Sequence, residues 1–220
     1  MSPIKLVIYL LAFCGGFIIM SLELLGGRML APYFGSGIYV WGSIITVFML
    51  SLSLGYLLGG RFSVHNPSIT KFATLFGGAA VLLYPLVYFA DSIMQVIFLQ
   101  IEDPRYGSLV ASCTLFIVPT IILGMISPYS VRLLVETVER SGQVAGKLYF
   151  MSTLGSSLGT LMTSFYFVLW FEVNTILTLM TVTLLLIAAV AVAADRFFGN
   201  DLIQLNGLKT PNAVDDTALK

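Results

Sequence analysis

Two charged residues inside an apolar stretch are the first candidates for chemistry. Glu23 and Arg28 lie in the stretch Met20-Ser-Leu-Glu-Leu-Leu-Gly-Gly-Arg28, close to the amino terminus. A carboxylate in hydrocarbon is costly, so it either forms a structural hydrogen bond or binds a cation or a proton in a pathway. A spacing of five residues turns about 500° around a helix, so the two side chains do not share a face. Glu23 therefore needs a partner on another segment, or a helix break near Gly26-Gly27.

Basic residues between two apolar segments form a second candidate set. Arg132, Arg140 and Lys147 surround a polar connection that also holds Glu136 and Glu139. Arg132 can extend to the membrane interface, where lipid phosphate or the carboxylate of a partner would meet it. The connection is either a solvated linker or a docking surface for a soluble partner.

Small and hydroxyl-bearing residues recur at intervals of four. Gly55 and Gly59 form one Gly-x-x-x-Gly pair, and Gly155 and Gly159 form another. Such pairs let helix backbones approach closely, which favours a packing role. A polar stripe lining a pathway is the alternative for the second pair, because four hydroxyls lie beside it: Ser152, Ser156, Thr160 and Ser164.

The aromatic residues after Arg28 allow two interpretations. Tyr33, Phe34, Tyr39 and Trp41 lie in or beside one short connection. Aromatic rings concentrate at the headgroup level of a membrane, which is the simpler interpretation. An aromatic lining for a cationic ligand is the alternative.

The sequence lacks the common motifs for phosphate binding, metal binding and nucleophilic catalysis. The sequence holds no phosphate-binding glycine loop, no HExxH, no CxxC and no GxSxG. Cys14 and Cys113 are isolated in apolar runs, and 11 basic residues balance 11 acidic ones. We therefore expect no enzymatic activity, no cofactor, no metal site and no nucleic-acid partner.

The elements that position these residues are expected to be membrane-spanning helices. Hydrophobic residues make up 58% of the 220 residues and charged residues only 10%. A helix needs about 20 mostly apolar residues to cross a bilayer. Six stretches meet this need: 6–30, 39–60, 69–89, 108–134, 146–171 and 175–194. The prediction is an all-α, six-helix transmembrane domain over residues 1–198, with a flexible cytoplasmic tail over 199–220.

The first stretch also resembles a signal peptide, but its apolar part is longer than the usual 7–15 residues.

The distribution of basic residues predicts how the chain is oriented in the membrane. With six spans, only Arg28 and Arg105 lie on one side, and the other side holds Lys5, Arg61, Lys71, Arg132, Arg140, Lys147, Arg196, Lys209 and Lys220. The positive-inside rule then places both termini in the cytoplasm. The expected location is a bacterial cytoplasmic (inner) membrane.

Three groups of motifs resemble one family. The most specific is Glu23-x-x-x-x-Arg-x-x-Ala-Pro-x-Phe-Gly35. The others are Leu52-Ser-Leu-Gly-Tyr-Leu-Leu-Gly-Gly-Arg61, and Leu123-Gly-Met-Ile-Ser-Pro128 followed by the glycine-rich run 142–159. Together they resemble the membrane domain of the fused MFS/spermidine synthase family, over most of residues 10–195.

The resemblance implies a fold like half of a major facilitator transporter, and it gives Glu23 and Arg28 as the site residues. The synthase-like domain that usually follows in that family has no counterpart among residues 1–220. The resemblance therefore implies a non-enzymatic membrane subunit that anchors, or works with, a soluble spermidine synthase-like protein. The alternative is a small homo-oligomeric transporter of a cationic or amine-type molecule, with Glu23 in its pathway.

Overall fold

The computed structural model describes residues 3–64, 67–135 and 137–207, and the side chains of residues 4–196 within these ranges. It contains helices and no strand in these ranges, so the all-α prediction is confirmed. The helices are α1 (Pro3–Phe34), α2 (Ile38–Phe62), α3 (Ile69–Gln100), α4 (Pro104–Leu134), α5 (Ser141–Met162), α6 (Val168–Trp170) and α7 (Val173–Gly207). A π-helical segment, η1 (Thr163–Phe167), joins α5 to α6.

Local sequence sets several helix ends. α1 ends before Gly35, whose φ of 79° lies in the left-handed region and whose N–H donates to the carbonyl oxygen of Ala31 at 2.9 Å. Glycine adopts this conformation without a steric cost. α4 begins with Pro104 at its first position, and the Asp103 carboxylate accepts from the Arg105 N–H at 2.9 Å. This is the usual chemistry of a helix start.

Five helices are long and apolar enough to cross a membrane, so the chain is an integral membrane protein by length and composition. They cover Ile4–Phe34, Ile38–Phe62, Ile69–Gln100, Pro104–Leu134 and Val173–Arg196. The remaining predicted span, 146–171, is helical through α5, η1 and α6 but is not among the five. Its glycines and hydroxyls lower its hydropathy.

The last helix is longer than the predicted span. α7 continues to Gly207, whereas the predicted span ends at residue 194. The helix therefore includes the start of the predicted tail, and residues 208–220 lie outside the described residues. The division into a domain over 1–198 and a tail over 199–220 stays a prediction.

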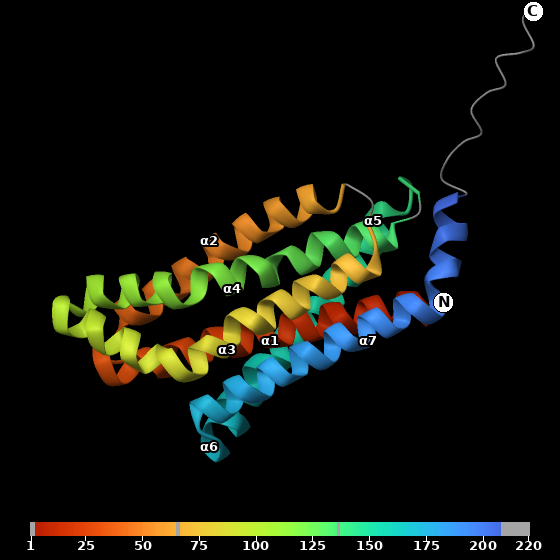
Figure 1. Cartoon of the computed structure of the whole chain (residues 1–220). Coiled ribbons are helices and arrows are strands. Elements are labelled where there is room, and N and C mark those ends of the chain that lie inside the picture. The colour runs from red at the N-terminus through yellow and green to blue at the C-terminus, as the bar shows by residue number, and fades with distance from the viewer. Residues whose placement is uncertain (1–2, 65–66, 136, 208–220) are drawn as a thin grey trace, which may run out of the picture.

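The helices form an elongated bundle in which successive helices run between its two ends (Figure 1). α1 packs on α5, α2 on α4, and α3 on α7, while α1 and α4 contact each other at the centre. α1 runs parallel to α5, because Phe13 and Phe17 lie against Gly155 and Gly159 in the same order. The amino end of α1 and the start of α5 therefore share one end of the bundle, which we call the basal end.

Aromatic packing closes the core near the basal end. Tyr129 of α4 is fully buried and stacks on Phe72 of α3, with ring centroids 5.6 Å apart and an interplanar angle of 5°. Its hydroxyl donates to the carbonyl oxygen of Ser68 at 3.0 Å and accepts from the Ser68 N–H at 3.0 Å. Tyr129 thus fixes the start of α3 against α4.

Replacing Tyr129 with phenylalanine is expected to destabilise the protein by about 1–3 kcal/mol, because the Ser68 N–H loses its acceptor. The Ser68 carbonyl oxygen loses one of two donors and keeps the Phe72 N–H at 3.0 Å. Thermal unfolding of the purified protein in detergent measures the effect. Tyr106→Phe is the matched control, since Tyr106 is 65% exposed. Equal melting temperatures for the two variants would show that the Ser68 hydrogen bonds contribute nothing.

Candidate functional site

Glu23 and Arg28 lie on an unbroken helix. α1 continues through Gly26 and Gly27 to Phe34, so the helix break that the sequence left open does not occur. Glu23 is half-buried and Arg28 is exposed. Within the described residues neither side chain forms a hydrogen bond or an ion pair, and no group of three His, Cys, Asp or Glu side chains is placed to hold a metal ion. The partner that the sequence predicts for this carboxylate is not found among the described residues.

The two glycines between Glu23 and Arg28 lie at close contacts with neighbouring helices. A β-carbon at Gly27 would lie 2.7 Å from the Trp41 ring, and one at Gly26 would lie 3.0 Å from the Phe116 ring. The two glycines therefore serve close packing against α2 and α4. Trp41, which the sequence predicts to lie in an interfacial aromatic belt, packs against α1.

Buried hydroxyls join α1 to α5. The Thr163 hydroxyl donates to the Ser21 hydroxyl at 2.8 Å, and the Ser21 hydroxyl donates to the Gly159 carbonyl oxygen at 3.3 Å. The Ser156 hydroxyl donates to the Gly16 carbonyl oxygen at 3.2 Å. Thr163 is also the first residue of the π-helix. Neither Ser21 nor Thr163 was predicted from the sequence as a site residue, because a small hydroxyl inside an apolar stretch is the only signal that each carries.

The four selected glycines all lie at helix contacts. A β-carbon at Gly155 would overlap the Phe13 carbonyl oxygen, and one at Gly159 would lie 2.9 Å from the Phe17 α-carbon. A β-carbon at Gly55 would lie 2.9 Å from the Gly124 α-carbon, and one at Gly59 would lie 2.6 Å from the Met125 carbonyl oxygen. These neighbours are backbone atoms, so the close approach depends on glycine.

The stripe of hydroxyls on α5 has two different environments. Ser156 is bonded to α1, and the Thr160 hydroxyl donates to the Ser156 carbonyl oxygen at 3.0 Å. Ser164 is exposed, as are Thr153 and Ser157 on the neighbouring face. The stripe is therefore partly a packing contact and partly an outward-facing polar surface.

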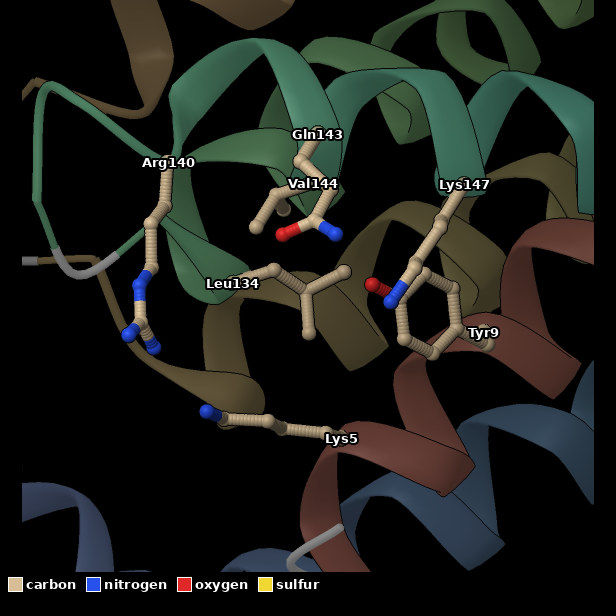
Figure 2. A pocket seen from close by; sticks show the side chains of 7 residues that line it. All are labelled: Lys5, Tyr9, Leu134, Arg140, Gln143, Val144 and Lys147. Carbon is tan, nitrogen blue, oxygen red and sulfur yellow. The ribbon is translucent and has the colours of Figure 1, made fainter.

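Two of the three selected cations share a pocket at the basal end, with Lys5 as a third cation. Figure 2 shows its lining: Lys5 and Tyr9 from α1, Leu134 from α4, and Arg140, Gln143, Val144 and Lys147 at the start of α5. The pocket has a volume of about 190 Å³. Arg132 lies in the last turn of α4 and is exposed, but it does not line the pocket. Of the three cations, Arg140 and Lys147 therefore line the pocket.

At the opposite end of the bundle, Arg105 contacts an aromatic residue of the protein itself. The Arg105 guanidinium lies 4.7 Å from the centre of the Tyr39 ring and donates to the Tyr39 hydroxyl at 3.4 Å. A cation–π contact therefore exists among these aromatic residues, but its cation belongs to the protein itself.

Comparison with protein-family models, with curated proteins and with solved structures gave no match to this chain. The resemblance to the spermidine synthase-like membrane domain therefore has no support beyond the motifs themselves.

Proposed function

We propose that this protein is a non-enzymatic integral membrane subunit whose basal end anchors a soluble partner. The observation that carries the proposal is the exposure of Arg132, Arg140 and Lys147 at that one end. Within the described residues, the side chains of these three cations form no hydrogen bond or ion pair. They are available to the carboxylates of another protein, which gives charge complementarity at an interface.

The resemblance supplies the partner class in this proposal. A soluble spermidine synthase-like protein would dock where the fused domain of the family follows the membrane helices. The positive-inside rule favours a cytoplasmic location for this basic end, which supports docking of a cytoplasmic protein on an inner-membrane subunit.

Affinity purification from the native membrane tests the proposal. The tagged protein is extracted in a mild detergent, and the proteins that accompany it are identified by mass spectrometry. Recovery of a soluble synthase-like protein in near-stoichiometric amount is the expected result. Recovery of this chain only as a discrete homo-oligomer would contradict the anchoring role.

A transporter is the second candidate, because one feature of α5 favours it. Thr153 and Ser157 of α5 and Ser164 of η1 are exposed, and α5 is less apolar than the five candidate spans. Half-buried Glu23 has no partner among the described residues. A second copy that covered this surface would enclose a polar pathway. Glu23→Gln would then abolish uptake of an amine-type substrate by proteoliposomes, whereas the anchoring role predicts unchanged recovery of the partner.

A further inference from the structure

We propose that the basal pocket between α1, α4 and α5 binds a phosphate group. The proposal goes beyond anchoring, because it concerns a ligand of this chain alone. The pocket brings three cationic side chains, Lys5, Arg140 and Lys147, to one small cavity. In Figure 2 the charged ends of Lys5 and Arg140 extend toward the same open side. Phosphate oxygens accept strong charge-assisted hydrogen bonds from such groups.

Two of the lining cations, Arg140 and Lys147, form no ion pair among the described residues. Glu139 precedes Arg140 in the chain and is exposed, but these two side chains form no ion pair in the described structure. Arg140 immediately precedes α5 and Lys147 lies in its second turn, and the start of this helix has no side-chain cap. The partial positive charge of that helix end adds to the field of the cations.

The size of the pocket restricts what enters it. Sites for small molecules usually measure about 300–1,000 Å³, so a pocket of about 190 Å³ holds one polar group rather than a whole metabolite. The rest of the ligand must lie outside. Leu134 and the ring of Tyr9, both buried, add apolar side-chain surface to the lining.

The surface beside the pocket fits an anionic phospholipid. Phe150 and Leu154 follow Lys147 by three and seven residues, so the three side chains lie on one face of α5. Phe150 is 65% exposed and Leu154 is 40% exposed. A lipid with its phosphate at Lys147 would lay an acyl chain over these two residues. Basic pockets between helices at the cytoplasmic side of a membrane are suited to such headgroups. A soluble phosphate ester shares the phosphate chemistry but would leave the apolar surface uncovered.

Native mass spectrometry of the purified protein in nonionic detergent tests the proposal. Phosphatidylglycerol and phosphatidylcholine are added separately, and the fraction of protein that retains one lipid is titrated. We expect the wild type to prefer phosphatidylglycerol. Arg140→Gln with Lys147→Gln should weaken that binding about 30-fold, since each basic residue at an anionic headgroup contributes roughly a fivefold factor.

Arg132→Gln is the matched control, because it removes an exposed cation at the same end but outside the pocket. Its binding should stay within about twofold of the wild type. The charge-retaining pair Arg140→Lys with Lys147→Arg should keep most of the affinity. Gel filtration and thermal unfolding confirm that each variant is folded.

Competition distinguishes the two sources of phosphate. If millimolar glycerol phosphate does not displace phosphatidylglycerol, the natural ligand is a lipid. If it does displace the lipid, the natural ligand is a soluble phosphate ester.

Equal retention of the two lipids by the wild type would overturn the proposal. So would an unchanged double variant, or a loss in Arg132→Gln as large as that in the double variant, which would indicate only diffuse surface charge. No partner protein is present, so failure of the anchoring role would leave these results unaffected.

Discussion

Gly155→Ala is expected to lower the melting temperature of the purified protein by about 6 °C or more. The new β-carbon would overlap the Phe13 carbonyl oxygen and lie 2.8 Å from its carbonyl carbon. Because backbone atoms cannot rotate away, α1 and α5 must separate, and the Ser21–Gly159 hydrogen bond is stretched. Overpacking costs about 1–3 kcal/mol, and a backbone clash belongs at the upper end. In a chain of this size, 1 kcal/mol shifts the melting temperature by about 2–4 °C.

Gly146→Ala is the matched control in the same helix. A β-carbon at Gly146 has no neighbour within 4 Å, and alanine is favoured over glycine in a helix by roughly 1 kcal/mol. Its melting temperature should therefore equal or exceed that of the wild type. A Gly155→Ala variant as stable as the Gly146→Ala variant would show that α1 and α5 do not pack at this distance.

Cysteine labelling in intact cells is expected to place the two ends of the α5–α6 run on opposite sides of the membrane. The run lies parallel to α1, which is itself a candidate span. Single cysteines are introduced by Thr137→Cys and Glu172→Cys, both at exposed positions, after the free Cys14 and Cys113 are replaced with serine. An impermeant maleimide should modify the cysteine at position 172 almost completely. The cysteine at position 137 should react only after the membrane is opened.

Either of two other patterns would contradict this topology. Equal labelling of both positions would mean that α5 does not cross the membrane, so that its lower hydropathy decides its placement. A reversed pattern would place the basal end outside the cytoplasm. A soluble cytoplasmic partner would then have no access to Arg132, Arg140 and Lys147.

The apolar helices were predictable from sequence because burial in lipid imposes a long apolar stretch whatever the neighbours are. The stretches 6–30 and 69–89 mark α1 and α3, although both helices extend several residues further. Hydropathy marks α5 less well as a membrane span, because its glycines and hydroxyls form contacts with α1 rather than with lipid. Hydropathy alone does not express that role.

The candidate site was predictable only in part. The selection of Arg140 and Lys147 came from their charge in a polar connection, but their grouping with Lys5 depends on α1 and α5 being neighbours. Helix alternation predicts that these residues share one end, yet it does not say which helices pack together. The same limit applies to the Ser21–Thr163 contact, which joins residues 142 apart in the chain. A partner for Glu23 was expected from the cost of its burial, and none occurs among the described residues.

Recovery of the partner by a cation-depleted variant tests the anchoring role most directly. Arg132→Gln, Arg140→Gln and Lys147→Gln are combined, and the synthase-like protein that accompanies the tagged chain is quantified against the wild type. We expect at least a tenfold loss, because removal of charges that meet a complementary surface weakens association. Arg28→Gln, outside the basal end, and a charge-retaining triple variant should recover wild-type amounts. Full recovery of the partner by the depleted variant, with its fold intact, would contradict docking at the basal end.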